Sequence, residues 1–403
     1  MDLWQGRISG EKIGLAVSGG GDSMSLLYLM RAWADQVGRK IFVATVDHGL
    51  RPESSDEAQM VSERCAKLGV PCEILKWRGW DRRGNTQDEA REARARLIGE
   101  WAGRIGVCAV ATGHTAEDQA ETFLMRLARG SGVDGLSGMA SMRTKGNTVW
   151  FRPMLSLRRD DLRQYLKTKR VKWIDDPSNE DLRFDRIKMR KAQKALDGLG
   201  LTVDRLVETA TRMSTARRGL ERLTKFHAAG VAKPSALGSV YLDLQAFGAL
   251  PLELRYRLFA HCLMWVSGAP YRPRFDALLE SAAKLSQGQD HTLLGCHILT
   301  DGTTAEVCRE VSAVNAFKGG DVFDGRWKVI GPAGADIRPL GPEGLPKCPE
   351  WRALGASRLS LMSCPSVWHS DELIAAPLAG IQGEWRFELR RSVHEFFTLI
   401  VMH

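Results

Sequence analysis

The sequence predicts an α/β protein, in which a Rossmann-like, doubly wound parallel sheet is followed by a mainly helical domain and a small β-rich C-terminal module. Strand and helix patterns alternate over the first 130 residues, helical patterns dominate the basic stretch that follows, and glycine and proline become dense beyond Gly319. A chain of 403 residues is long enough for two or three domains. We expect three, over residues 1–225, 226–318 and 319–403.

The amino-terminal elements follow one another through short connections. A short apolar run at residues 13–17 ends in serine and glycine, which predicts a buried strand and a turn. Asp22 and Ser23 then open a helix that we expect from Met24 to about Ala34. Further strands are expected within residues 40–49, 71–77 and 107–114, and further helices within 54–69, 86–106 and 115–130. This alternation is typical of a parallel sheet covered by helices.

The remaining chain changes character twice. Helical, basic patterns extend over about residues 155–229. A mixed region follows, with strand patterns within 239–247, 291–299 and 303–311 and helices at about 251–266 and after Pro273. The glycine- and proline-rich stretch after Gly319 indicates a boundary and a terminal β-rich module.

Composition excludes several classes of protein. Apolar runs stay well short of the ~20 residues that a membrane span needs, and residues 1–12 lack the apolar region of a signal peptide. We therefore expect a cytoplasmic protein. The eight cysteines show no Cys-x-x-Cys spacing, which argues against a zinc or iron–sulfur site.

The connection after the first strand predicts a phosphate site. Its glycines leave backbone N–H groups uncovered and permit positive φ, and the helix that follows adds free N–H donors and the positive end of a dipole. A Gly-Lys-Ser/Thr ending and a spaced Gly-x-Gly-x-x-Gly pattern are both missing. The loop is similar to the pyrophosphate loop of ATP pyrophosphatases, which adenylate a substrate oxygen; an ordinary glycine turn would need its Asp-Ser pair by chance. The expected ATP-binding residues are Ser18, Gly19, Gly20, Gly21, Asp22 and Ser23.

Other polar residues follow the ends of neighbouring strands. Asp47 with His48, and Gly113 with His114, should converge with the loop, because ligands of such sheets bind at the carboxyl ends of the strands. Asp47 could hold Mg²⁺ or accept a proton, or it could simply cap a turn. Asp118 lies on the following helix beside Glu121 and Thr122, where ordinary surface acids and capping by Thr115 are the alternative.

The net charge of +9 is concentrated in one segment. Residues 152–225 hold 20 Lys/Arg against 11 Asp/Glu, a difference of +9, so the remaining chain sums to zero. Because the excess continues through several predicted helices, it favours a polyanionic partner such as RNA over a merely solvated helix face. Arg183, Arg186 and Arg190 form a helical stripe that suits phosphates of ATP or RNA, although such a stripe could equally face solvent.

Several motifs in order resemble the bacterial tRNA(Ile)-lysidine synthetase family. They are AVSGGGDSMSLL, VDHGLRPESSDEA, NTQDEAREARARL, ATGHTAEDQAETFLMRLARGSGVDGLSGM, RPML and DDPSNEDLRFDRIKMR, which together cover residues 13–191. RPLGPEG and HSDELIAAPLAGIQGEW are similar to degraded forms of the family's last domain. The chain departs from the family in carrying a single lysine, Lys347, between these two motifs and Asp-Arg-Ile-Lys-Met-Arg at residues 185–190.

The resemblance implies a two-step reaction on the wobble cytidine of a CAU-anticodon isoleucine tRNA, which changes codon reading from AUG to AUA. ATP adenylates the C2 oxygen, pyrophosphate leaves, and the ε-amine of free lysine then displaces AMP to give lysidine. Mg²⁺ on Asp22 and Asp47 would spread the developing charge. Asp47, Asp118, Arg183 and Arg190 are the expected catalytic residues, with Asp47 the first candidate to deprotonate the lysine, and His48, Gly113 and His114 are expected to contact ATP.

Two alternatives stay open at this point. tRNA thiolases of the same superfamily also adenylate a cytidine C2 oxygen, but they generally use paired cysteines. A catalytically inactive tRNA-binding protein is the second, against which the intact Ser18, Asp22, Ser23 and Asp47 argue. No protein or membrane partner is implied.

Overall fold

The structure is a computed structural model that describes residues 8, 10–49, 52–78, 86–146, 148–174, 185–317 and 319–400. The chain divides into two compact units, residues 1–217 and 218–403, and the division falls within helix α8 (Val203–Ala228). The three-part division at residues 225 and 318 stays a prediction.

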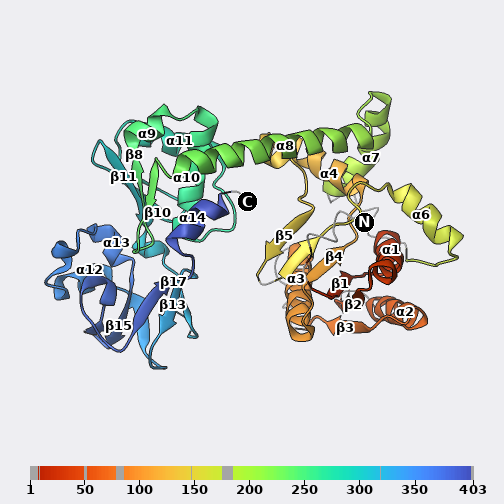
Figure 1. The fold of residues 1–403 in the computed structure, drawn as a ribbon, viewed down its shortest axis with the longest axis horizontal. Helices are drawn as coiled ribbons and strands as arrows, with labels where there is room; N and C mark the ends of the chain where they lie inside the picture. Colours follow the sequence, from red (N-terminus) through yellow and green to blue (C-terminus); the bar gives the residue numbers. More distant parts are fainter. Residues whose placement is uncertain are drawn as a thin grey trace. The chain divides into compact units, whose positions relative to one another are not determined.

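The amino-terminal unit is built on a six-stranded sheet with the strand order β3-β2-β1-β4-β6-β5. All neighbouring strands run parallel except β5, which pairs antiparallel with β6. The chain visits β1, β2 and β3 in one direction and then crosses back to β4, which confirms the predicted doubly wound fold class (Figure 1). The strands are β1 (Lys12–Ala16), β2 (Lys40–Asp47), β3 (Cys72–Lys76), β4 (Ala109–Thr112), β5 (Met142–Lys145) and β6 (Thr148–Phe151).

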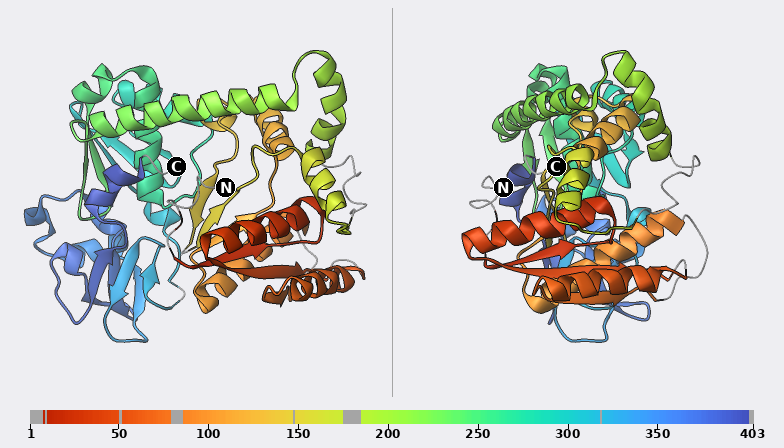
Figure 2. Two further views of the ribbon diagram at one scale, coloured as in Figure 1. Left: turned by 45° about the vertical axis from the view of Figure 1, so that its right-hand side comes forward. Right: turned by 90° about the vertical axis from the view of Figure 1, so that its right-hand side faces the viewer.

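Helices cover both faces of this sheet, as the views in Figure 2 show. α1 and α2 pack on the face that carries Ile13 and Val43, whereas Trp101 of α3 packs on the opposite face against Val110. The alternation of side chains along each strand places an apolar set on either face, so both faces become buried. The helices of this unit are α1 (Gly21–Val37), α2 (Ser54–Lys67), α3 (Thr86–Ile105), α4 (Ala116–Leu127), α5 (Val133–Leu136), α6 (Arg159–Thr168), α7 (Asp185–Gly198) and the first part of α8.

A separate apolar cluster joins α4 to the helices that follow the sheet. Ala120 and Phe123 of α4 pack with Leu206 and Ala210 of α8, and Met189 of α7 lies against them. This packing holds α7 beside α4, so the polar faces of the two helices can meet. Among the described residues, no helix is long and apolar enough to cross a membrane.

The C-terminal unit contains antiparallel sheets, of which those after residue 319 match the expected β-rich module, whereas the five-stranded sheet lies within the region expected to be mainly helical. A five-stranded sheet, β7-β8-β11-β10-β9, is covered by α10, whose apolar residues such as Leu258 and Phe259 are completely buried. Two three-stranded sheets follow, β12-β13-β17 and β14-β15-β16, and they share a core around Trp327 and Val367. The strands are β7 (Ala232–Pro234), β8 (Val240–Asp243), β9 (His291–Leu293), β10 (Cys296–Thr300), β11 (Thr304–Arg309), β12 (Val322–Phe323), β13 (Trp327–Ile330), β14 (Asp336–Pro339), β15 (Pro365–His369), β16 (Glu372–Ala375) and β17 (Arg386–Leu389), and the helices are α9 (Leu244–Ala249), α10 (Leu252–Ser267), α11 (Phe275–Ser286), α12 (Gly341–Gly344), α13 (Arg358–Met362) and α14 (Val393–Leu399).

Candidate adenylation site

The loop between β1 and α1 is held in shape by its own two serines. The backbone N–H of Ser18 donates to the hydroxyl of Ser23 over 3.1 Å, and that hydroxyl donates to the carbonyl of Gly20 over 2.9 Å. Gly19 has a φ of 89°, a conformation that residues with a Cβ rarely adopt. The loop is therefore shaped before any ligand binds.

α1 begins directly after this loop, at Gly21 rather than at the predicted Met24. Its N-cap, Gly20, offers no side-chain acceptor to the first N–H groups of the helix, and Asp22 lies in the first turn. A 17-residue helix with free N–H groups at its start favours an anion there. Phosphate oxygens of a nucleotide fit this position.

Close packing around the loop leaves no room for side chains at two glycines. A Cβ on Gly19 would lie 2.7 Å from Cδ1 of Ile174, whose backbone N–H donates to the Gly19 carbonyl. A Cβ on Gly113, which follows β4, would lie 3.1 Å from backbone atoms of Asp22 and Ser23. The end of β4 and the start of α1 are thus in direct contact, which places two predicted site segments together.

Arg159, at the start of α6, links the loop to α4. Its Nε donates to Asp22 over 3.0 Å and its Nη2 donates to Asp118 over 3.3 Å. Its Nη1 lies 3.9 Å from Glu121. Three carboxylates from two helices therefore surround one guanidinium, whose side chain is only 14% exposed. The sequence analysis did not single out Arg159, because nothing local to Arg158-Arg159 shows which of the two turns toward the loop.

The arginine stripe of α7 faces the same carboxylates. Arg186 donates to Asp118 over 2.8 Å and to Glu121 over 2.7 Å, and Arg190 donates to Glu121 over 2.9 Å. Part of the positive excess of this segment is thus neutralised within the unit itself. Arg183, the other expected catalytic arginine, lies outside the described residues.

Burial and neighbouring charges shift the pKa values of these carboxylates in opposite directions. Burial raises the pKa of Asp22, with the nearby Asp118 adding to the rise and Arg159 opposing it. Burial also acts to raise the pKa of Asp118, but Arg186, Arg159 and the backbone N–H of Thr115 outweigh it, so this pKa is lowered. Thr115 and Asp118 form a capping box at the start of α4, as the helix-capping alternative expected. Asp118 therefore stays ionised, whereas Asp22 is the better proton acceptor of the two.

His114 follows Gly113 and is held neutral. Its Nδ1 lies 2.9 Å from the hydroxyl of Thr112, and burial lowers its pKa to about 4, although Asp118 favours the charged form. Arg152 and Arg186 lower this pKa further. A neutral imidazole at this edge can exchange hydrogen bonds with a nucleotide without adding charge.

Arg152 is a buried cation that the sequence analysis named only as part of a motif. Its Nη1 donates to the carbonyl of Ala140 over 2.7 Å, and its Nε has no hydrogen-bond partner among the described residues. Burial lowers its pKa to about 10, and the neighbouring Arg143 and Arg91 lower it as well. Guanidinium groups that gather without a matching carboxylate favour an anionic ligand.

Asp47 ends β2, next to β1 in the sheet, and both of its carboxylate oxygens already accept hydrogen bonds. The backbone N–H of Gly49 donates to Oδ1 over 3.0 Å, and the hydroxyl of Ser55 donates to Oδ2 over 2.7 Å. This is the geometry of the turn-capping alternative, and the catalytic role of Asp47 stays a prediction. His48 Nε2 lies 3.3 Å from Nη2 of Arg94 on α3.

Among the residues that the structure describes, no group of three or more His, Cys, Asp or Glu side chains is arranged to hold a metal ion. Mg²⁺ needs fewer protein ligands, because one or two carboxylates and the phosphates of a nucleotide complete its coordination. Asp22, in the first turn of α1, fits that requirement. Asp47 fits it less well, because each of its oxygens already accepts one hydrogen bond, from Gly49 and from Ser55.

The matching family model and the similar sequences of known proteins agree with each other. Residues 3–194 match the family model of the PP-loop domain. The tRNA(Ile)-lysidine synthase of Ruegeria pomeroyi is 43% identical over 396 residues, which span 97% of this chain and 94% of that protein. The enzyme of the same name from Wolbachia pipientis is 37% identical over 75% of this chain and 72% of its own length. A solved U34-tRNA thiolase from Methanococcus maripaludis, with its 4Fe–4S cluster, is 16% identical at a TM-score of 0.45, over 52% of this chain and 73% of that one.

Proposed function

The chain belongs to the tRNA(Ile)-lysidine synthase family, and we propose that it ligates free lysine to the wobble cytidine of CAU-anticodon tRNA(Ile) at the loop between β1 and α1. In the first step the C2 oxygen of cytidine attacks the α-phosphorus of ATP, and pyrophosphate leaves. In the second step the ε-amine of lysine attacks C2, the bond between C2 and the adenylated oxygen breaks, and AMP leaves. The products are lysidine, AMP and pyrophosphate.

The contact between the loop and the end of β4 is the observation that carries this proposal. Gly113 lies against Asp22 and Ser23, so the phosphate loop and the neutral His114 face one ligand together. The free N–H groups at the start of α1 would hold the departing pyrophosphate. Arg152, which is close enough to His114 to lower its pKa, would add a positive charge near the end of β4. Charge that develops on the phosphates is thereby stabilised by groups already in place.

The site residues also suit the implied magnesium ion. Asp22 would hold it, with Asp47 as the second candidate ligand, and the bound ion would neutralise charge on the phosphates. The link from Arg159 keeps the Asp22 carboxylate in position within the first turn of α1. Fixing that carboxylate before substrate arrives lowers the reorganisation that the reaction requires.

The second step requires a proton acceptor. A free lysine ε-ammonium group has a pKa near 10.4, so it must lose a proton before it can attack. We keep Asp47 as the first candidate, because each of its oxygens retains a lone pair beyond the hydrogen bonds from Gly49 and Ser55.

The basic helices would hold the RNA. Arg190 uses its Nε for Glu121, and its side chain is 37% exposed, which leaves other N–H groups for a phosphate. Arg183 is proposed to act beside it. The anticodon arm then lies against the segment that carries the positive excess, and binding weakens as salt rises. A reaction on tRNA is consistent with the cytoplasmic location that we propose.

The test follows each step separately. The protein is incubated with ATP, lysine and tRNA(Ile) transcript; pyrophosphate exchange reports the first step, and nucleoside mass analysis reports the second. We expect Asp22→Asn to reduce both readouts, and Asp47→Asn to reduce lysine transfer more than exchange. Asp35→Asn is the matched control, because Asp35 is an exposed residue at the far end of the same helix. A wild-type protein that binds tRNA but forms neither adenylate nor lysidine would contradict the proposal.

A further inference from the structure

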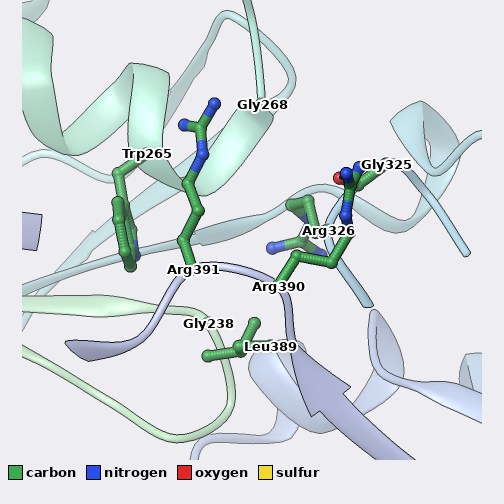
Figure 3. Close-up of a pocket in the computed structure, with 8 residues that line it drawn as sticks. All are labelled: Gly238, Trp265, Gly268, Gly325, Arg326, Leu389, Arg390 and Arg391. Atoms are coloured by element: carbon green, nitrogen blue, oxygen red, sulfur yellow. The ribbon is translucent and has the colours of Figure 1, made fainter. Parts of the chain in front are cut away.

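The C-terminal unit contains a hollow that is lined in part by arginine side chains (Figure 3). The residues that line it are far from the adenylation loop in the sequence. Three of its eight lining residues are arginines, one is tryptophan, and no carboxylate is among them. The hollow is lined by Gly238, Trp265, Gly268, Gly325, Arg326, Leu389, Arg390 and Arg391. Its chemistry therefore suits an anion.

Arg326 forms the buried part of this hollow. Its side chain is 6% exposed, and its Nε donates to Oδ2 of Asp324 over 3.0 Å. Its Nη2 is buried and has no hydrogen-bond partner among the described residues. In Figure 3 a terminal nitrogen of Arg326 points toward the side on which Trp265 and Arg391 lie. A buried N–H donor without an acceptor is unfavourable, and a ligand oxygen would satisfy it.

The carboxylate of Asp324 does not balance the charges around it. It accepts hydrogen bonds from Arg309 over 3.0 and 3.1 Å as well as from Arg326. Asn315 also donates to it, so its oxygens are saturated. Two buried guanidinium groups thus share one carboxylate, which leaves one positive charge uncompensated in a place where unpaired charge is unfavourable.

Arg390 and Arg391 add two exposed charges where the chain leaves β17. The Arg390 side chain makes one long hydrogen bond among the described residues, 3.4 Å from its Nη1 to the carbonyl of Gly325. Neither Arg390 nor Arg391 forms an ion pair within the described part of the chain. Gly238, at a φ of 73°, keeps the wall open, because a Cβ there would lie 3.2 Å from Nη1 of Arg326. The hollow thus carries three guanidinium groups and one unpaired buried donor.

We propose that this hollow binds a terminal phosphate group, and that its source is the 5′-phosphate of the tRNA substrate. A phosphate monoester carries about −1.5 to −2 charges at neutral pH and three free oxygens, which suit several guanidinium groups better than a singly charged backbone phosphate does. A monoester also has one ester substituent, so it can enter the hollow end-on with its free oxygens toward Arg326. A backbone phosphodiester has two substituents that must both leave the hollow.

The source of the phosphate rests on the proposed function, because only a protein that binds tRNA meets a 5′ end. A free small phosphate ester offers the same chemistry. The two sources are distinguished by whether the phosphate has to be attached to RNA.

The experiment measures equilibrium binding of the full chain to one tRNA(Ile) transcript in two forms, with a 5′-phosphate and with a 5′-hydroxyl. We expect the wild-type protein to bind the phosphorylated form about tenfold more tightly. Arg390→Gln with Arg391→Gln should reduce that ratio to about twofold or less, because two of the three guanidinium groups are lost. Arg358→Gln is the matched control: this exposed arginine of α13 lies outside the hollow, and its loss should leave the ratio unchanged.

Two further arms complete the test. Gly238→Ala should also lower the ratio, because its Cβ would lie 3.2 Å from Nη1 of Arg326, and it leaves every arginine in place. Circular dichroism checks its fold first, because the φ of 73° at this position is strained for alanine. Inorganic phosphate should raise the melting temperature of the wild type more than that of the double variant. If the wild type binds both tRNA forms equally but is stabilised by inorganic phosphate, the tRNA source is overturned and a free phosphate ester is the ligand. If it binds both forms equally and inorganic phosphate does not stabilise it, the site itself is overturned. Lysidine formation by the wild type is measured in parallel, so failure of the proposed function is seen separately.

Discussion

Replacing Arg159 by methionine removes a guanidinium that joins the phosphate loop to the carboxylates of α4. The Asp22 carboxylate then loses a 3.0 Å bond from Nε, whereas the α4 carboxylates keep their bonds to the arginines of α7. A hydrogen bond between charged groups contributes about 1.5–3 kcal/mol. Because the Arg159 and Asp22 side chains are 14% and 26% exposed, solvent screens the pair in part. We therefore expect a loss of about 1.5–2 kcal/mol, which is roughly a 10- to 30-fold slower first step.

The assay is tRNA-dependent ATP–pyrophosphate exchange, measured as initial rates at saturating ATP. Arg158→Met is the matched control, because this neighbouring arginine pairs with Glu117 and Asp204 at the surface and does not contact the loop. An exposed pair contributes about 0–1 kcal/mol to stability, so the control should keep its exchange rate within about twofold of the wild type. The reasoning is refuted if Arg159→Met also stays within about twofold, or if both variants lose activity equally.

Two further predictions concern the end of β4. Burial lowers the pKa of His114 from 6.5 to about 4. Between pH 6.5 and pH 4 the unfolded chain therefore binds more protons than the folded chain does. The free energy of unfolding of the wild type should fall by about 3 kcal/mol as the pH is lowered through this range. Urea denaturation at several pH values should show that slope flattened in His114→Gln; an unchanged slope would assign it to other groups. Gly113→Ala places a Cβ 3.1 Å from the backbone of Asp22 and Ser23, which must shift by a few tenths of an ångström; we expect about 1–3 kcal/mol of destabilisation and roughly tenfold slower adenylation. Gly103→Ala is the control, because a Cβ there meets nothing within 4 Å, and alanine should stabilise α3 by up to ~1 kcal/mol. Equal adenylation rates in the two variants would count against a role for the contact between Gly113 and the start of α1.

Local patterns predicted the order of elements well. The helix expected at about residues 251–266 is α10, Leu252–Ser267, because a long apolar run with a glycine after it marks a buried helix and its end. The start of α1 was placed three residues late, since the apolar period begins at Met24 whereas Gly21, Asp22 and Ser23 form a polar first turn. Periodicity depends on near neighbours in the chain, and for that reason sequence reasoning recovers it.

The composition of the phosphate loop was likewise visible in the sequence. Glycines, a first-turn aspartate and two serines between a strand and a helix already specify backbone N–H groups that favour phosphate. The structure adds that Ser18 and Ser23 bond to each other within the loop. It also adds the contact at Gly113, which depends on two strands lying side by side.

The order of strands and helices along the chain, the helix positions and the anion-binding loop thus follow from residues that are near one another in the sequence. Which arginine meets which carboxylate does not, because Arg159 and Asp22 are 137 positions apart and only folding brings them within 3.0 Å. The same holds for Asp324, which lies in the turn between β12 and β13 whereas its partner Arg309 ends β11, so the unbalanced charge at Arg326 has no trace in the local sequence. Side-chain periodicity is a short-range property. The pairing of charges, in contrast, is decided when distant segments pack together, because a buried charge without a partner is unfavourable in the protein interior.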